Sequence, residues 1–97
     1  MADTEEEPHE VVRLSGDVDM YAAPDTWRVI EDRLGGGSSR FEIDLAEVGY
    51  IDSSGLAVLV RTQQALAARN RTLVLTNVGP HVRHVITLAG LTADLGV

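Results

Sequence analysis

The sequence contains no cysteine and no lysine, and it has no long run of apolar residues. Without cysteine the chain has no disulfide, no thiolate nucleophile and no zinc–thiolate site. A membrane-spanning helix needs about 18 or more consecutive apolar residues, and the acidic N-terminal segment is unlike a secretory signal. We therefore expect a cytoplasmic protein without membrane insertion.

The composition that is present predicts one small globular domain. Hydrophobic residues make up 44% of the 97 residues and charged residues 24%, which is close to the globular average. A chain of this length can bury roughly 60–70% of its unfolded surface, enough for one modest core. The length leaves no room for a two-domain enzyme with a cleft between its domains.

The net charge of −7 is concentrated at the N-terminus. Five of the fifteen acidic residues lie within the first ten positions, so the remaining chain has eight basic and ten acidic residues, a balance of −2. The eight arginines are scattered, which argues against a basic surface for nucleic acid. We expect residues 1–9 to form an acidic flexible leader and residues 10–97 to form a single domain.

Hydrophobic periodicity predicts alternating strands and helices. Strands are expected over residues 10–19, with a bend at Gly16, over 41–45 and over 72–76. Helices are expected from Pro24 to Leu34, from Leu56 to Arg69 with Asn70 as a left-handed cap, and from Pro80 to about Ala89. Residues 91–97 could add an edge strand. This order predicts an α/β fold with a largely parallel sheet and right-handed crossovers.

The segment Asp52-Ser53-Ser54-Gly55 lies where the long central helix is expected to begin. Its simplest interpretation is a helix cap, since an Asp or Ser oxygen can accept bonds from the free N–H groups of the first turn. The same N–H groups and the helix dipole also favour an anion, so a phosphoserine here would be tolerated. It would add about −1.5 to −2 charges without melting the helix. These four residues do not decide between Ser53 and Ser54.

The surrounding sequence resembles the STAS domain family, which includes the bacterial anti-sigma factor antagonists. The resemblance is carried by residues 41–59 (FEIDLAEVGYIDSSGLAVL), by 14–19 (LSGDVD) and by 77–91 (NVGPHVRHVITLAGL), and it extends from about Val11 to Leu91. It implies a four- to five-stranded mixed sheet with helices packed mainly on one face. It also implies that Ser54 is the phosphoacceptor, with Ser53 less favoured, and that Asp19 lies nearby. The implied partner-binding residues are Asp19, Asp52, Ser53, Ser54, Gly55 and Leu56.

The sequence departs from the family pattern at two places. An extra strand usually precedes the first segment of the resemblance, but here only the charged leader precedes Val11, so that strand is expected to be short or missing. An exposed sheet edge would follow, which could pair with another chain. Gly79 stands where many relatives have Ser before Pro80; glycine is an acceptable N-cap without a side-chain acceptor.

The resemblance implies a regulatory binding protein and not an enzyme. The expected partner is an anti-sigma factor that is also a serine kinase. Binding to it would release a sigma factor for transcription, in a stress response for example, and phosphorylation would end binding until a phosphatase reset the switch. No cofactor, metal or nucleic acid is expected, and the chain would be a monomer or weak dimer. Two alternatives remain open: a constitutive STAS subunit of a stress-sensing complex or lipid transporter, and a nucleotide-binding sensor.

Other candidate chemistries have less support. His81 and His84 lie on one helical turn, but a metal site needs a further ligand. A hydrolase built from Ser54, His84 and Asp19 would lack the G-x-S-x-G turn and a substrate pocket. Trp27 falls on the inner face of its helix and is expected in the core. No P-loop or dinucleotide-binding motif is present.

Overall fold

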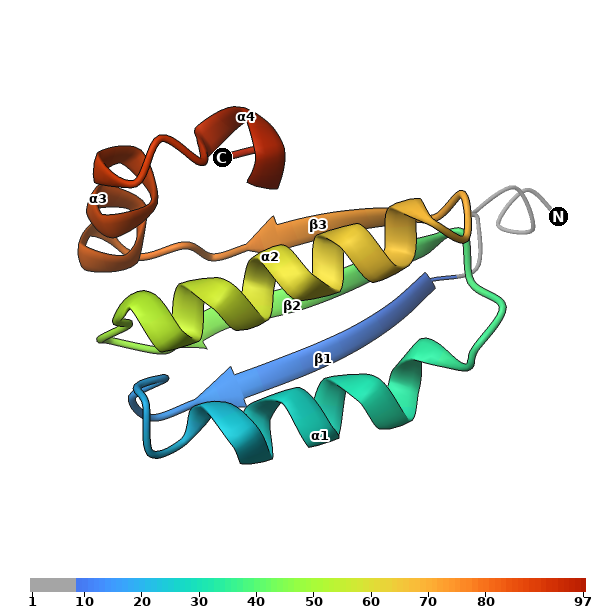
Figure 1. Cartoon of the computed structure of the whole chain (residues 1–97), viewed down its shortest axis with the longest axis horizontal. Coiled ribbons are helices and arrows are strands. Elements are labelled where there is room, and N and C mark those ends of the chain that lie inside the picture. The colour runs from blue at the N-terminus through green and yellow to red at the C-terminus, as the bar shows by residue number, and fades with distance from the viewer. Residues whose placement is uncertain (1–8) are drawn as a thin grey trace, which may run out of the picture.

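The computed structural model describes residues 9–97, so the expected leader and the short or missing first strand lie outside the described residues, except for the backbone of His9. Strands and helices alternate along the described chain as the periodicity predicts (Figure 1). In order the elements are β1 (His9–Ser15), α1 (Ala23–Leu34), β2 (Arg40–Glu47), α2 (Ser53–Ala67), β3 (Thr72–Thr76), α3 (Pro80–Leu88) and α4 (Thr92–Leu95).

The sheet of residues 9–97 has three strands in the order β1-β2-β3, and both pairs are parallel. The prediction of a four- to five-stranded mixed sheet is therefore wrong for this part of the chain. The C-terminal segment, expected as an edge strand, forms the short helix α4 instead. Its Leu95 is only 2% exposed, and α4 contacts both α2 and β3. The single helical turn of α4 places this leucine in the core. An edge strand would leave the same side chain beside the sheet.

One face of the sheet is covered and the other is open. Along β2, Phe41, Ile43 and Leu45 are buried, whereas Glu42 and Asp44 between them are only half-buried. Side chains of a strand alternate between its two faces, so the buried set faces the helices. Figure 1 shows α2 lying along the sheet, α1 on the β1 side, and α3 and α4 on the β3 side. The expected packing of helices mainly on one face agrees with this pattern.

The core is apolar apart from one hydroxyl. The largest fully buried apolar side chains are Phe41, Ile30, Ile43, Leu45, Leu59, Leu66, Ile86, Leu95 and Val82. Thr62 is the one buried polar residue among residues 10–97, and its hydroxyl donates to the Val58 carbonyl at 2.8 Å. Trp27 is half-buried and packs against this core, close to its expected place. Arg61 lies over the Trp27 ring at 4.0 Å, so α1 and α2 also meet through a cation–π contact.

Two conformations predicted from single residues are present. Gly16 has a φ of +80°, and the β1–β2 register shifts just before it, between Arg13 and Ser15. Asn70, with a φ of 57°, ends the turn that follows α2. Beyond the bend, Val18 forms a further parallel bridge with Ile51. The chain after β1 is thereby brought to the first turn of α2.

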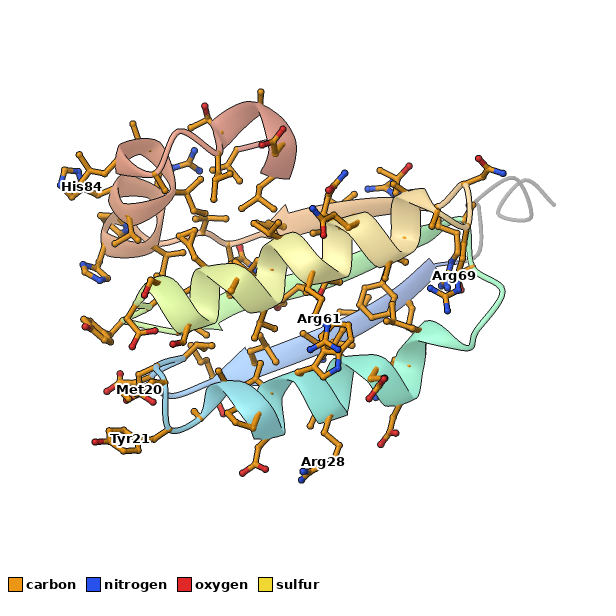
Figure 2. The ribbon with its side chains drawn as sticks, viewed as in Figure 1. Met20, Tyr21, Arg28, Arg61, Arg69 and His84 are labelled. Carbon is orange, nitrogen blue, oxygen red and sulfur yellow. The ribbon has the colours of Figure 1, made fainter. Side chains whose placement is uncertain are left out.

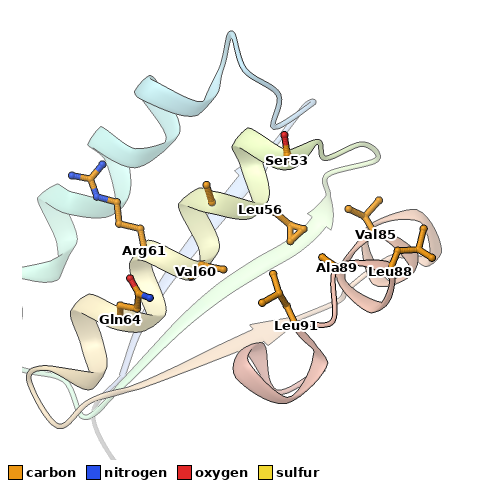
Figure 3. A pocket seen from close by; sticks show the side chains of 10 residues that line it. Ser53, Leu56, Val60, Arg61, Gln64, Val85, Leu88, Ala89 and Leu91 are labelled. Carbon is orange, nitrogen blue, oxygen red and sulfur yellow. The ribbon is translucent and has the colours of Figure 1, made fainter.

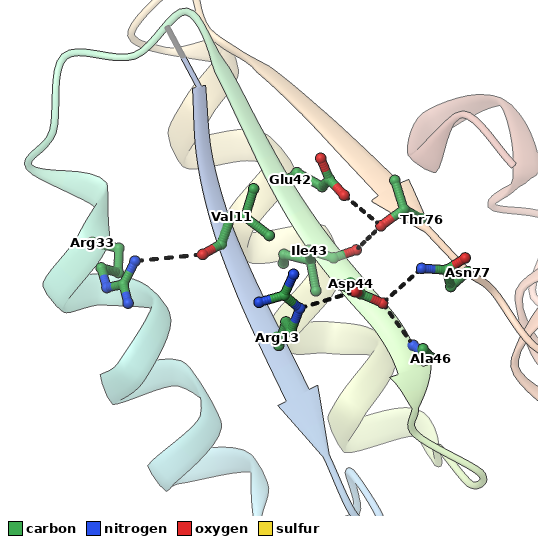
Figure 4. Close-up of polar contacts among 9 residues, drawn as sticks. All are labelled: Val11, Arg13, Arg33, Glu42, Ile43, Asp44, Ala46, Thr76 and Asn77. Atoms are coloured by element: carbon green, nitrogen blue, oxygen red, sulfur yellow. Dashed lines mark hydrogen bonds and ion pairs between the residues drawn. The ribbon is translucent and has the colours of Figure 1, made fainter.

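The open face carries a polar network around Asp44 (Figure 4). The Asn77 amide donates to Asp44 Oδ1 at 3.0 Å and the Ala46 N–H donates to the same oxygen at 2.9 Å. The Arg13 guanidinium lies 3.4 Å from Oδ2. These contacts, the Asn77 bond first, hold the pKa of the Asp44 carboxyl below its ordinary value of 3.8, against the opposing effect of burial.

Acid is therefore expected to weaken this network. A carboxyl whose pKa is lower in the folded state stabilises the fold above its unfolded pKa, and that contribution is lost as the pH falls through the folded pKa. Replacing Asn77 with glycine, which tolerates the φ of 54°, removes the largest cause. We expect the NMR titration midpoint of Asp44 to rise toward 3.8 in Asn77→Gly, and the loss of stability below about pH 4 to become smaller. An unchanged midpoint would contradict this assignment.

Arg71 secures the glycine-rich connection between α1 and β2. Its guanidinium donates through Nε to the Ser38 carbonyl and through Nη1 to the Leu34 carbonyl at 2.7 Å. The group also lies 5.8 Å from the centre of the Phe41 ring. One side chain thus binds two carbonyls. The first is at the C-terminal end of α1, where helix carbonyls lack intrahelical partners, and the second is in the connection.

We expect Arg71→Ala to lower the free energy of unfolding by about 1–3 kcal/mol, because two carbonyls lose a charged donor. Arg71→Lys should restore only part of the loss, since an ammonium lacks the planar fork of donors. Arg69→Ala is the matched control: Arg69 is exposed and its guanidinium donates to the Ala65 carbonyl of the preceding helix, so its effect should stay within about 0.5 kcal/mol. Urea unfolding measures all three, and equal losses at 69 and 71 would refute the role of Arg71.

Candidate functional site

Asp52 is the N-cap of α2, and its side chain occupies the helix N-terminus. Its Oδ1 accepts from the N–H of Ser54 at 2.8 Å and from the N–H of Gly55 at 3.1 Å. The helix begins at Ser53, three residues before the Leu56 expected from periodicity, because the cap comes directly before the two serines. Two of the N–H groups expected to receive an anion are thus already bonded to a carboxylate of the chain itself.

A second carboxylate organises the loop between β1 and α1. Asp19 Oδ1 accepts from the N–H groups of Tyr21 and Ala22, each at 3.0 Å. The Asp19 carbonyl also accepts from Ala22 at 3.1 Å and from Ala23 at 2.8 Å. The Asp19 side chain therefore holds the turn that precedes α1, whereas the N-cap of α1 is Ala22, which makes no side-chain cap bond.

The two carboxylates are linked through Met20. The other oxygen of Asp52, Oδ2, accepts from the Met20 N–H at 3.0 Å. Residues 19 and 52, far apart in the sequence, therefore lie at one end of the molecule, as the resemblance implied for Asp19 and the serine segment. The loop after β1 and the first turn of α2 form one hydrogen-bonded unit.

Gly55 allows these segments to approach closely. The Val18 N–H donates to the Tyr50 carbonyl at 3.0 Å, and the Asp52 N–H donates to the Val18 carbonyl at 3.3 Å. A Cβ on Gly55 would lie 2.2 Å from that Val18 oxygen and 2.6 Å from Cγ1 of Ile51. Only glycine fits here without moving backbone, so Gly55 has a structural role.

The two serines open onto different sides of α2. Ser53 is exposed and lines a groove of about 810 Å³ between α2 and α3, whose other lining residues are mainly apolar (Figure 3). Ser54 is half-buried and lines a second groove, of about 640 Å³, between α1 and α2. Met20, Trp27 and Arg61 line that second groove as well. Leu56 is buried and lines the first groove.

All six residues named as partner-binding from the sequence thus belong to this end of the molecule. The sequence reasoning did not include Met20 and Tyr21, the two apolar residues that follow Asp19 and are largely exposed. The sequence signal that could have found them is their position directly after Asp19, the last residue of the segment 14–19 that resembles the family. Whether an apolar residue is exposed depends on the neighbours that the fold places around it. The hydrophobic periodicity of the sequence does not contain this information.

The histidines of α3 are surface residues. His81 and His84 are both exposed, and the His81 ring stacks on Tyr50 at 5.1 Å between centroids. Among residues 10–97 no group of three or more His, Cys, Asp or Glu side chains could hold a metal ion. None of the helices in that range is both long enough and apolar enough to cross a bilayer.

We expect Asp52→Ala to lower the free energy of unfolding by about 2 kcal/mol, because three backbone N–H groups lose their acceptor. Asp52→Asn should cost about half as much. Its amide oxygen can keep the two helix bonds, whereas its NH₂ group would face the Met20 N–H, donor against donor. Urea unfolding measures both, with Asp32→Ala on the exposed part of α1 as control. Equal effects of Ala and Asn would contradict the linking role of the second oxygen.

The chain is similar in sequence and in fold to known proteins. A family model described as "Mlab, STAS domain" matches residues 1–96. The anti-sigma-B factor antagonist of Staphylococcus epidermidis is 29% identical over 80 residues, which are 82% of this chain and 74% of that protein. The crystal structure of an anti-sigma factor antagonist from Mycobacterium paratuberculosis is 30% identical, covers 93% of this chain and 76% of its own, and superposes with a TM-score of 0.79.

The fold is also shared by SpoIIAA, an anti-sigma factor antagonist. Its unphosphorylated form is 24% identical with a TM-score of 0.76 and covers 93% of this chain and 79% of its own. Its phosphorylated form is 23% identical with a TM-score of 0.69 and covers 93% and 82%. The strand–helix order, the capped serine segment and the family match lead to one assignment: this chain belongs to the STAS domain family and is similar, within it, to the anti-sigma factor antagonists.

Proposed function

We propose that this chain is an anti-sigma factor antagonist and that phosphorylation of Ser54 switches its binding to an anti-sigma factor. The observation that carries the proposal is the hydrogen-bonded unit in which Asp52 caps the helix bearing Ser54 and also holds the loop of Asp19. The names of the similar proteins support the same role. Neither line of support favours a constitutive subunit of a transporter or stress complex.

The position of Ser54 supports it as the acceptor over Ser53. Ser54 lies in the groove between α1 and α2 beside Met20, so a group attached to it adjoins the loop that Asp19 and Asp52 organise. Ser53 is more exposed but opens onto the opposite groove, toward α3. A partner that docks on the Asp19 loop therefore meets Ser54 directly.

The chemistry of the switch belongs to the partner. In the proposed cycle the anti-sigma factor is a serine kinase that holds ATP and magnesium. Ser54 Oγ attacks the γ-phosphorus, the bond from that phosphorus to the oxygen of ADP breaks, and a base on the kinase takes the hydroxyl proton. This chain supplies the nucleophile and its orientation. A phosphatase hydrolyses the phosphoserine and resets the cycle.

Phosphorylation changes the charge at the interface more than it changes the fold. The Asp52 carboxylate already accepts three N–H bonds in the first turn and the loop, so a phosphate on Ser54 adds about −1.5 to −2 charges beside an existing anion. Two arginines line the same groove; Arg61 lies over the Trp27 ring and Arg28 is paired with Asp25. A dianion left uncompensated when the partner closes over it would cost about 3–5 kcal/mol of binding.

The direct test is to map the modified serine. The chain is incubated with a candidate anti-sigma kinase and MgATP, and the phosphorylated peptide is sequenced by mass spectrometry. We expect one phosphate on the wild type and on Ser53→Ala, and none on Ser54→Ala, while unmodified Ser54→Ala remains bound to the kinase. Modification that persists in Ser54→Ala and disappears in Ser53→Ala would overturn the assignment of the acceptor.

A further inference from the structure

Two large apolar side chains are exposed to solvent in the loop that follows Asp19, and one of them, Met20, lines the groove of the proposed acceptor. Met20 is 61% exposed and Tyr21 is 84% exposed, and both extend from the loop between β1 and α1 (Figure 2). Exposed apolar residues are common singly. Two adjacent ones at a functional edge of a small domain call for an explanation.

The backbone beneath these side chains is held firmly. The Met20 N–H is bound by Asp52 and the Tyr21 N–H by Asp19, each at 3.0 Å, and Ala22 shares the Asp19 oxygen. Binding a partner through such residues requires little loop ordering, because the backbone cost has been met in folding. Rigid aromatic side chains with few rotatable bonds are the residues that most often dominate binding energy at interfaces.

The position of Met20 indicates which partner this loop would meet. Met20 lines the same groove as Ser54, and its N–H is bound by the residue that caps the Ser54 helix. A kinase that brings ATP to the Ser54 hydroxyl through this groove meets Met20, and Tyr21 is the next residue of the same loop. We propose that Met20 and Tyr21 are the anchor residues through which the anti-sigma factor docks and selects this chain. This inference rests on the proposed function and specifies the surface that it uses.

The chemistry of the anchors defines the complementary site on the partner. Met20 is flexible and polarisable and suits an apolar surface of irregular shape. Tyr21 presents a ring with a hydroxyl at its tip, so its pocket should be apolar along the walls with a polar group at the end. The partner site is thus an apolar pocket placed beside the nucleotide of the kinase.

The test separates docking from phosphoryl transfer. Binding of Tyr21→Ala, Met20→Ala and Tyr21→Phe to the anti-sigma kinase is measured by calorimetry, and phosphorylation of Ser54 is followed at varied concentration of the chain. Val29→Ala is the matched control, since Val29 is 49% exposed on α1 and does not line the Ser54 groove. Unfolding midpoints are recorded for every variant to show that each is folded.

We expect Tyr21→Ala to weaken binding roughly tenfold to a hundredfold, as for an interface hot spot. The KM for the chain should rise by a similar factor while kcat changes little, because the Ser54 hydroxyl itself is untouched. Met20→Ala should act in the same direction, Tyr21→Phe less strongly, and Val29→Ala by less than about twofold. If the wild type is phosphorylated at Ser54 and binds, but Tyr21→Ala and Met20→Ala bind equally well, the docking proposal fails and the proposed function stands. If the wild type neither binds nor is modified, both fail.

Discussion

Replacing Gly55 with alanine is expected to destabilise the chain by about 3 kcal/mol or more, at the upper end of what overpacking costs. The new Cβ would lie 2.2 Å from the Val18 carbonyl oxygen and 2.6 Å from Ile51 Cγ1. The nearer atom belongs to backbone, and that carbonyl also accepts from the Asp52 N–H. The segment around Val18 and the helix α2 must therefore move apart. Alanine has a higher helix propensity than glycine by about 1 kcal/mol, but this gain does not offset the cost of that movement.

Gly49→Ala provides the matched control for this clash. A Cβ at Gly49 would meet no atom within 4 Å, so its effect on urea unfolding should stay within about 0.5 kcal/mol. Gly55→Ala should also bind the anti-sigma factor poorly, since the same displacement moves Ser54. Similar unfolding free energies for the two variants would contradict a steric clash between a side chain at position 55 and the Val18 carbonyl.

Replacing Ser54 with aspartate is expected to weaken binding to the anti-sigma factor by about a hundredfold to a thousandfold or more. An uncompensated charge in a closed interface costs about 3–5 kcal/mol of binding free energy. A factor of ten in affinity corresponds to about 1.4 kcal/mol, so this cost gives the expected loss. Aspartate has one charge where a phosphate has nearly two, so the true phosphoprotein should bind at least as weakly. The fold should be unaffected, because Ser54 is only half-buried and its backbone N–H, which donates to Asp52 Oδ1, is retained by aspartate.

The neighbouring serine supplies the control for the switch. Ser53→Asp places the same charge one residue away, but in the groove toward α3, and we expect less than a tenfold loss of affinity. Pull-down with wild type and both variants side by side, followed by calorimetry, measures the difference. If Ser54→Asp bound as tightly as wild type, electrostatic switching at this position would be wrong, and a constitutively bound STAS subunit would become the better description.

The regular elements were largely predictable because they depend on near neighbours in the chain. Alternation along residues 41–45 predicted a strand with one buried face, and the structure has β2 with Phe41, Ile43 and Leu45 buried. Pro24 and Pro80 marked the starts of α1 and α3. These features arise from steric limits and hydrogen bonds within a few residues, which the local sequence contains.

The errors occurred where distant segments compete. Residues 91–97 have apolar residues compatible with an edge strand, but burial of Leu95 favours the short helix α4. The number of strands came from the resemblance, and in residues 9–97 only three are present. Strand pairing is a choice among partners far apart in the chain, so short periodic patterns do not decide it.

The serine segment shows the same division. By itself the sequence determined a capped helix start with two serines and a glycine, because caps use bonds over two or three residues. Only the tertiary structure decided that the second oxygen of Asp52 holds Met20, that Gly55 lies against Val18, and that Ser53 and Ser54 face different grooves. Those contacts join residues more than thirty positions apart, and they exist only once the parallel sheet has brought the end of β1 beside the start of α2.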